Sequence, residues 1–268
     1  MTSQDKETWD EADVLGVRVS AIGMEKAVEL ALRSIQSGRN GYVCVSGVHG
    51  VMEAQADASF RSILNGAFLN LPDGMPMTWV GRFQGHKKMD RVFGPDFMKM
   101  LCQASVGSGY RHFLYGGAPG VADELKQSLE RMAPGLLVIG TYTPPFRPLT
   151  HEEEEDLFNL LRESQPHIVW VGLSTPKQER FMAQYALRVP PSLMIGVGAA
   201  FDYHTGRISD SPLWVKRTGM QWLHRLLQDP RRLWRRYLRN NPAFLWKISL
   251  QTLRQRRAAR PRRASTIL

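Results

Sequence analysis

The sequence predicts an α/β protein with a mainly parallel, Rossmann-like sheet, flanking helices, and a basic amphipathic helical appendage towards the C-terminus. Short apolar runs rich in β-formers alternate with amphipathic runs from residue 24 to residue 200, which is typical of a parallel sheet covered on both faces. Glycine follows five of the apolar runs, and ligands bind at that end of the strands in such sheets. The excess of positive charge is confined to the last fifth of the chain.

The predicted elements follow in chain order. MEKAVELALRSIQ has helical spacing and stops at Ser37-Gly38, so a helix is expected over residues 24–36. The next elements are a strand at 42–46, a helix at 49–56, a strand at 67–71, helices from 75 and at 95–105, a strand at 112–116, a helix at 119–131 and a strand at 136–142. A helix then begins at Thr150, where an acidic first turn suits the positive end of the helix dipole. The last elements of the core are a strand at 167–173, a helix at 176–188 and a strand at 192–200.

We predict a core over residues 1–215, a basic helical appendage over 216–255, and a disordered tail over 256–268. Residues 216–268 carry 15 Lys and Arg against one acid, a net charge of +14, whereas the other 215 residues carry 20 bases and 24 acids, a net charge of −4. Apolar and aromatic residues interleave with arginine in the appendage, as in helices that lie on an anionic membrane surface. Asn240-Asn241-Pro242 is expected to separate two helices there.

Composition places the protein among globular proteins, with 43% apolar and 22% charged residues. Cys44 and Cys102 each lie in an apolar setting, which predicts buried thiols in a reducing compartment. The acidic start is no secretory signal, and no apolar run approaches the roughly 20 residues of a spanning helix, so we expect a cytoplasmic protein. The arginine and aromatic residues of the appendage would also suit a nucleic acid as partner. A nucleic-acid-binding function would not explain the glycines at the strand ends, so we do not expect the protein to bind nucleic acid.

Two carboxylates follow predicted strands. Asp73 lies in LPDGMP and Asp202 in GVGAAFD, both at the edge of the sheet where a ligand is expected. The simpler interpretation of Asp73 is an Asx turn or a helix N-cap, because Asp-Gly is favoured in both. The alternative is a general base that deprotonates a hydroxyl nucleophile, with an acidity tuned by burial.

Other strand ends offer groups that could bind a phosphate or a sugar. Gly116 and Gly117 open a loop that leads into a helix, where backbone N–H groups favour a phosphate, although a tight turn explains the loop equally well. Ser174, Lys177 and Gln178 could donate to a diphosphate or sugar, or could form the polar first turn after an N1 proline. His49 could be a base or a ligand, but a partly buried, hydrogen-bonded histidine is the simpler interpretation.

Several chemistries are disfavoured by missing motifs. No Gly-Lys-Ser/Thr follows the glycine loop, and no G-x-S-x-G elbow is present. The incomplete dinucleotide fingerprint argues against a nicotinamide-dependent oxidoreductase. No His/Cys/Asp cluster has metal-ligand spacing, so neither a metal nor a cofactor is expected. Sugar transfer from a nucleotide sugar fits best, because a diphosphate leaves while a carboxylate deprotonates the acceptor hydroxyl.

The chain resembles the WecG/TagA/CpsF glycosyltransferases (glycosyltransferase family 26) over nearly its whole length. The segments that carry the resemblance are LPDGMP at 71–76, RVFGPD at 91–96, FLYGGAPGVA at 113–122, VGLSTPKQE at 171–179, IGVGAAFDYHTG at 195–206 and WLHRLLQDPRRLWRRYL at 222–238. The resemblance implies an inverting, metal-independent transfer from a UDP-sugar to a polyprenyl-diphosphate-linked glycan. It also implies a place on the cytoplasmic face of the membrane and products that feed cell-surface polysaccharides and exopolysaccharides.

The resemblance also implies roles for matching residues. Asp73 matches the proposed catalytic base, Gln178 a glutamine of the pocket, and Asp202 an aspartate near the nucleotide. The arginines of the appendage that match those thought to reach the acceptor diphosphate are Arg225, Arg232 and Arg235.

One departure leaves the substrates open. Many members carry Thr-X-Asn after the first strand, where this chain reads VSGVH at 45–49. If that asparagine contacts the sugar or the acceptor in the family, the contact is either missing in this chain or made by Ser46 or His49. The sugar (N-acetylmannosamine, its uronic acid, glucose or another), the acceptor glycan and a homo-oligomeric state stay open, as does a scaffold that has lost activity.

Overall fold

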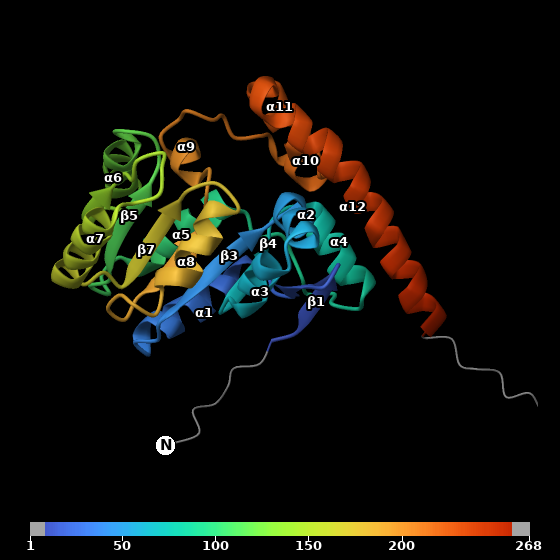
Figure 1. Cartoon of the computed structure of the whole chain (residues 1–268), viewed down its shortest axis with the longest axis horizontal. Helices are drawn as coiled ribbons and strands as arrows, with labels where there is room; N and C mark the ends of the chain where they lie inside the picture. The colour runs from blue at the N-terminus through green and yellow to red at the C-terminus, as the bar shows by residue number, and fades with distance from the viewer. Residues whose placement is uncertain (1–8, 259–268) are drawn as a thin grey trace, which may run out of the picture.

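A computed structural model describes residues 9–258 and confirms the predicted fold class. Six parallel strands form one sheet in the order β4-β3-β8-β7-β5-β6, with the helices packed on both faces (Figure 1). The strands of this sheet are β3 (Gly41–Ser46), β4 (Leu69–Pro72), β5 (Arg111–Gly116), β6 (Leu137–Tyr142), β7 (Ile168–Gly172) and β8 (Leu193–Gly196). All six carboxyl ends therefore lie at one edge of the sheet.

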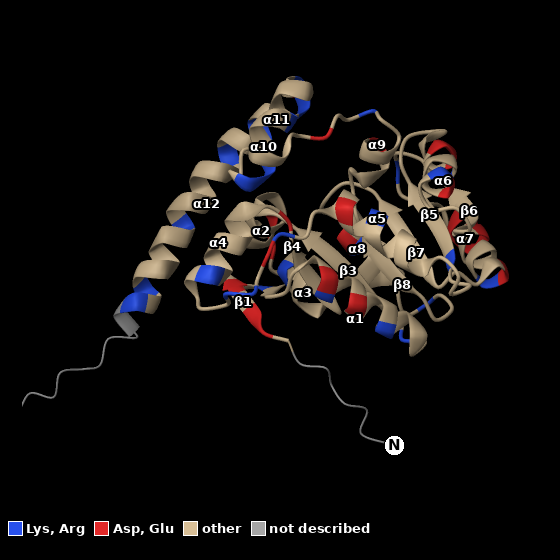
Figure 2. Cartoon of the chain, turned by 180° about the vertical axis from the view of Figure 1, so that it is seen from behind, with Lys and Arg blue, Asp and Glu red and all other residues tan. Residues whose placement is uncertain are grey.

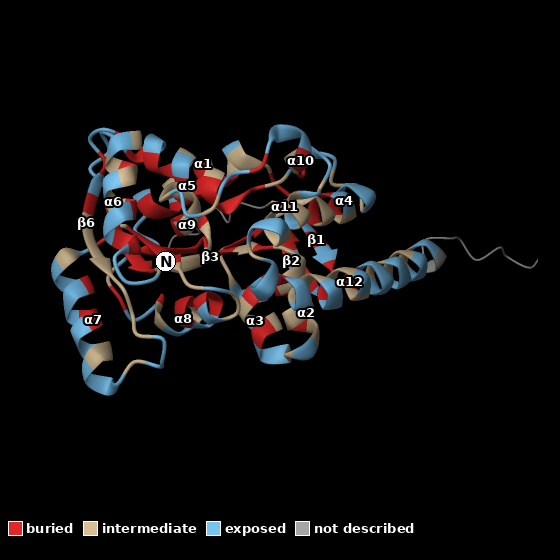
Figure 3. Ribbon diagram, turned by 90° about the horizontal axis from the view of Figure 1, so that it is seen from above, coloured by how far each residue is buried: buried red, intermediate tan, exposed pale blue. Residues whose placement is uncertain are grey.

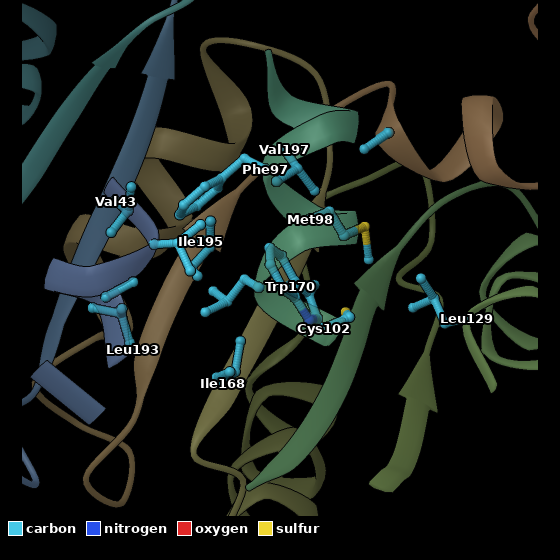
Figure 4. Close-up of a cluster of buried hydrophobic side chains, with 14 of the residues drawn as sticks. Val43, Phe97, Met98, Cys102, Leu129, Ile168, Trp170, Leu193, Ile195 and Val197 are labelled. Carbon is cyan, nitrogen blue, oxygen red and sulfur yellow. The ribbon is translucent and has the colours of Figure 1, made fainter. Parts of the chain in front are cut away.

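One face of the sheet is covered by α1 (Met24–Gln36), α5 (Gly94–Ser105), α6 (Val121–Met132) and the short α9 (Ala200–His204). Figure 4 shows the apolar side chains packed there, with Trp170 of β7 near Phe97, Met98 and Cys102 of α5. Trp170 is fully buried and donates its indole N–H to His112 at 3.0 Å. Burial lowers the pKa of His112 to about 4, so this imidazole stays neutral as an acceptor.

The opposite face is covered by α2 (Val48–Ala56), α3 (Ala58–Gly66), α7 (His151–Ser164) and α8 (Lys177–Tyr185), and Figure 3 shows these helices across the sheet from α1, α5 and α6. The acidic start of α7 forms a capping box, in which the Thr150 hydroxyl accepts from the Glu153 N–H at 3.3 Å and the Glu153 carboxylate accepts from the Thr150 N–H at 2.8 Å. Both cysteines are buried and free, as predicted.

The hairpin of β1 (Glu11–Val14) and β2 (Val17–Ser20) and helix α3 have no counterpart in the sequence prediction, and neither does the short α9. The hairpin lies beside β4. The Asn70 amide of β4 donates to the Arg18 carbonyl at 2.9 Å and fixes the hairpin there. Helix α3 begins after Asp57, whose carboxylate caps it by accepting from the Phe60 N–H at 3.0 Å.

Two predicted elements are corrected. The strand expected to reach residue 200 ends at Gly196, because the chain turns at Val197–Ala199 into α9. The expected break at Asn240-Asn241-Pro242 is absent, since α12 (Pro230–Ala258) runs through it. Pro242 is exposed, whereas Asn240 and Phe244 on either side of it are buried against the core. Docking at both points holds the two halves of the helix in line.

The C-terminal helices lie over the ligand edge of the sheet and along the side of the core (Figure 1). They are α10 (Leu213–Arg217), α11 (Gln221–Gln228) and α12, and α4 (Met75–Phe83) lies near them on the core. Helix α12 packs on α2, where Asn240 lies 3.0 Å from His49 and Phe244 joins the apolar cluster that contains Val51. The Gln251 amide joins Leu15 and Asp13 of the hairpin at 2.8 Å each. It ends three residues beyond the predicted boundary at 255, and the rest of the predicted tail lies outside the described residues.

Candidate active site

Asp73 follows β4 directly, and its backbone N–H donates to the Ser46 carbonyl of β3 at 3.0 Å. The N-cap residue of α4 is Gly74, which has a φ of +90° and no side-chain cap, so the N-cap interpretation of Asp73 is wrong. Among residues 9–258 the Asp73 carboxylate has no hydrogen-bond partner. An unpaired carboxylate at the ligand edge of a sheet is free to accept a proton from a bound hydroxyl.

The surroundings of Asp73 set its acidity. Burial raises the pKa of this carboxyl above its ordinary value of 3.8, Arg91 and Arg225 lower it, and Asp96 raises it again. Because the effect of burial is the largest, the net shift is upward, in the direction that makes a carboxylate a better base near neutral pH. The two arginines come from different parts of the chain, one from the core and one from α11.

Arg91 reaches this site from the segment between α4 and α5. The neighbouring Val92 N–H donates to the Pro72 carbonyl at 2.8 Å, which holds the segment against the end of β4. The Arg91 guanidinium lies 4.4 Å from the centre of the Phe93 ring and donates to the Gln221 side chain of α11. Arg91 thus ties the core to the C-terminal helices beside Asp73.

A cavity of about 310 Å³ opens between α9 and α11. Its lining residues are Asp202, Arg207, Ile208, Arg225, Gln228, Asp229 and Arg232. The structure thus brings together three residues singled out in the sequence, Asp202, Arg225 and Arg232. Three arginines against two aspartates leave the lining with a net charge of +1.

The three arginines of the cavity differ in their partners. Arg207 is held by Glu124 at 3.0 Å and Arg232 by Asp229 at 2.6 Å. Arg225 forms no salt bridge with any residue that the structure describes, and its guanidinium lies 5.4 Å from the centre of the Tyr203 ring. It lines the cavity and also lowers the pKa of Asp73, so it links the two halves of the site.

The glycines at the ends of β5 and β7 allow these strands to approach closely. A Cβ atom at Gly116 would lie 2.7 Å from the Gly172 carbonyl carbon, and one at Gly172 would lie 2.6 Å from the Phe201 ring. The Gly117 N–H donates to the Gly172 carbonyl at 3.1 Å. This amide is therefore occupied, and the tight-turn interpretation accounts for Gly117.

The turn before α8 uses its own amides in the same way. The N–H groups of Lys177 and Gln178 return to the Ser174 carbonyl at 2.8 and 3.3 Å. The side chains of Ser174 and Lys177 are exposed, whereas Gln178 is buried against the end of β8. The groups that this turn can offer a ligand at the surface are thus a hydroxyl and an ammonium, not the two amides.

Ser46 and His49 lie on either side of the start of α2. The Ser46 hydroxyl is buried and has no partner among the described residues. His49 is partly buried, with Asn240 of α12 at 3.0 Å from its Nδ1, in agreement with the simpler interpretation. Burial and the nearby Arg236 lower the pKa of His49, which favours the neutral ring. A contact of either residue with substrate stays a prediction.

The chain has relatives among known proteins. The model of the WecG/TagA/CpsF glycosyl transferase family matches residues 12–258. The chain belongs to this family. It is also 29% identical, over 186 residues, to the N-acetylglucosaminyldiphosphoundecaprenol N-acetyl-beta-D-mannosaminyltransferase of Bacillus spizizenii, and the match covers 69% of this chain and 70% of that relative. The protein is thus a glycosyltransferase.

Some residues of the candidate site were not singled out in the sequence: Arg91, Arg207, Ile208, Gln228 and Asp229. The RVFGPD segment could have indicated Arg91, because it is one of the segments that carry the family resemblance and it begins fewer than twenty residues after Asp73. Arg207 and Gln228 gave no such signal, since their place in the cavity depends on how α11 packs over α9.

Arg235 lies outside the cavity, on the solvent side of α12. It is exposed, and its guanidinium lies 5.2 Å from the centre of the Trp234 ring. The exposed large apolar side chains of α11 and α12 are Trp222, Leu227, Trp234, Leu238, Leu245, Trp246, Leu250 and Leu253. Lys and Arg residues are spread along the same helices (Figure 2). Within residues 9–258 we find no helix with the length and apolarity of a bilayer span.

Proposed function

We propose that this glycosyltransferase moves a sugar from a UDP-sugar to a polyprenyl-diphosphate-linked glycan, with inversion at the anomeric carbon and without a metal ion. The product would enter cell-surface or exopolysaccharide biosynthesis. The observation that carries the proposal is the unpaired Asp73 carboxylate beside Arg225, which also faces the basic cavity. The relative from Bacillus spizizenii is named for transfer to a sugar linked by a diphosphate to undecaprenol, which supports an acceptor of this kind.

In the proposed reaction, Asp73 takes the proton of the acceptor hydroxyl. The hydroxyl oxygen attacks the anomeric carbon from the face opposite the nucleotide, the bond from that carbon to the β-phosphate oxygen breaks, and UDP leaves with the electron pair. The exposed side chains of Ser174 and Lys177 are proposed to donate hydrogen bonds to the diphosphate of UDP, and Asp202, which lines the cavity, is proposed to lie near the nucleotide. Positive groups placed before the reaction stabilise the charge that develops on the leaving group.

Arg225 and Arg232 are proposed to bind the diphosphate of the acceptor. Guanidinium groups bind phosphate in bidentate fashion, and Arg225 forms no salt bridge within the described residues. Asp229 Oδ2 lies 2.6 Å from Arg232 Nε and neutralises part of its charge. We therefore expect Arg225 to contribute more than Arg232 to binding of the acceptor diphosphate. Arg235, which lies with Trp234 on the outer side of α12, is assigned instead to the membrane surface.

The outer side of α11 and α12 is proposed to rest on the inner face of the cytoplasmic membrane. Tryptophan and arginine together suit the headgroup region of an anionic leaflet. Each Lys or Arg near such a surface contributes about 1 kcal/mol, so a few of them suffice for reversible binding. Sedimentation with anionic vesicles, but not with neutral vesicles or with DNA, is the expected result; retention on DNA at moderate salt would support the nucleic-acid alternative.

The test of the reaction is UDP release. Purified protein is incubated with vesicles, an N-acetylglucosaminyl-diphosphate-polyprenol and a panel of UDP-sugars that includes N-acetylmannosamine, its uronic acid and glucose. We expect one donor to give acceptor-dependent release, and Asp73→Asn to lower turnover by about 10²–10⁴-fold while UDP still binds. No release with any donor, while UDP binds, would favour a scaffold without activity. Equal loss of turnover and UDP binding in Asp73→Asn would make Asp73 a structural residue.

A further inference from the structure

A cluster of buried polar side chains flanks the carboxyl end of β8. Gln178 and Glu179 at the start of α8 are 3% and 1% exposed, and Ser46 at the end of β3 is also buried. In the sheet β8 lies between β3 and β7, so these residues approach its end from both sides. Within the described part of the chain, Ser46 Oγ, Gln178 Oε1 and Glu179 Oε2 have no hydrogen-bond partner. Buried polar atoms are nearly always paired, so three unpaired ones at the ligand edge on either side of β8 point to a ligand site.

Glu179 fixes the direction of the Gln178 amide. Its Oε1 accepts from the Thr175 hydroxyl at 2.8 Å and from Gln178 Nε2 at 3.0 Å. A carboxylate accepts and does not donate, so the nitrogen end of the amide must face Glu179. Burial raises the pKa of Glu179, but a proton on Oε2 would leave Oε1 as the same acceptor. The carbonyl end of Gln178 therefore points away from Glu179.

Two glycines leave room for this amide. A Cβ atom at Gly196 would lie 3.1 Å from Gln178 Nε2, and one at Gly198 would lie 3.4 Å from Gln178 Oε1. Gly198 has a φ of +50°, so the backbone passes over the carbonyl end without a side chain. The carbonyl oxygen thus lies directly under the turn where β8 ends, at the ligand edge of the sheet.

We propose that Glu179 is a positioning residue that presents the Gln178 carbonyl oxygen to the donor sugar, where it accepts a hydrogen bond from a hydroxyl or an acylamino N–H group. The inference rests on the proposed function and deepens it, because it names the kind of sugar group that is recognised. The reversed amide would set its carbonyl oxygen against the Glu179 carboxylate, where neither can donate, and it would present N–H donors that an acylamino N–H group cannot accept. Glu179 thus determines sugar recognition without touching the sugar.

The test is Glu179→Gln, which keeps the size of the side chain but can both donate and accept, so it no longer fixes the amide. We expect kcat/KM for the productive UDP-sugar to fall about tenfold, equivalent to about 1.4 kcal/mol, mainly through KM. The dissociation constant of UDP, which lacks the sugar, should stay unchanged. The matched control is Thr175→Val, which removes the other donor to Glu179 Oε1 and leaves the bond to Gln178, so its effect on KM should be clearly smaller.

Gln178→Leu keeps the inference testable if Glu179→Gln does not fold. It removes the acceptor and should weaken binding of the UDP-sugar relative to UDP, and the double variant should lose little more than either single variant. A wild-type KM in Glu179→Gln, or unchanged preference for the UDP-sugar over UDP in Gln178→Leu, would overturn the inference. An inactive wild-type protein would instead contradict the proposed function.

Discussion

Phe244 and Leu245 are neighbours on α12 with opposite surroundings, which allows docking of the helix and its membrane contact to be tested separately. Phe244 is 2% exposed and joins the apolar cluster beneath α2, whereas Leu245 is 62% exposed. Leu233 is the other buried large apolar side chain of α12 within residues 230–256. At about 1.5–3 kcal/mol each, the two buried side chains contribute about 3–6 kcal/mol to docking.

Phe244→Ala should cost about 3–5 kcal/mol, because a cavity adds to the lost burial. That is most of the docking free energy, so α12 should leave the core while the sheet stays folded. Hydrogen exchange is expected to rise across residues 230–258, acceptor-dependent transfer should fall, and UDP binding should persist. Leu245→Ala should change stability by less than about 0.5 kcal/mol and weaken vesicle binding instead.

Two outcomes would refute this reasoning. Wild-type exchange protection of α12 in Phe244→Ala would show that other contacts hold the helix, such as the Gln251 hydrogen bonds to the hairpin. Equal unfolding of core and helix in one transition would show that α12 is an inseparable part of the core. Separate transitions, with transfer lost and UDP binding kept, would show that the C-terminal helices complete the acceptor side of the site.

Three further predictions follow from single contacts. Burial raises the pKa of Asp73 above 3.8, so kcat/KM should fall as the pH drops through this raised pKa. Arg225→Met removes a cation that lowers the pKa of Asp73, so it should move the acidic limb of the pH–rate profile to higher pH. Gly172→Ala places a Cβ atom 2.6 Å from the Phe201 ring, and the resulting overpacking should cost about 1–3 kcal/mol in a denaturant titration. Pro242→Ala should stabilise α12 by up to about 3 kcal/mol, seen as slower hydrogen exchange, with transfer unchanged.

The sequence predicts the sheet well because parallel strands are nearly continuous apolar runs between amphipathic helices. The hairpin at residues 11–20 was missed because two strands of four residues carry too little periodicity, and α3 because it follows α2 after a single capping residue, Asp57. The expected break at Pro242 failed for a different reason. Tertiary docking through Asn240 and Phe244 outweighs the local preference of proline to end a helix.

The candidate site was predictable where topology alone decides the position. Asp73, Ser174 and Asp202 follow strands or strand-end turns, so the parallel sheet brings them to one edge. The rotation of a docked helix is set by its packing, which the sequence does not show. Arg225 therefore faces the cavity and Arg235 faces outwards, although both carry the same family resemblance.

Arg225 gives the proposed reaction a physical order. In the absence of substrate it lowers the pKa of Asp73, so part of its charge is used to stabilise the ionised base. A diphosphate bound to Arg225 would compensate that charge, and the pKa of Asp73 would then rise towards the value that burial alone sets. The carboxylate would become a stronger base at the moment when the acceptor hydroxyl arrives. Because Arg225 lies on α11, this coupling exists only while the C-terminal helices are docked, so acceptor binding and activation of the base depend on the same contact.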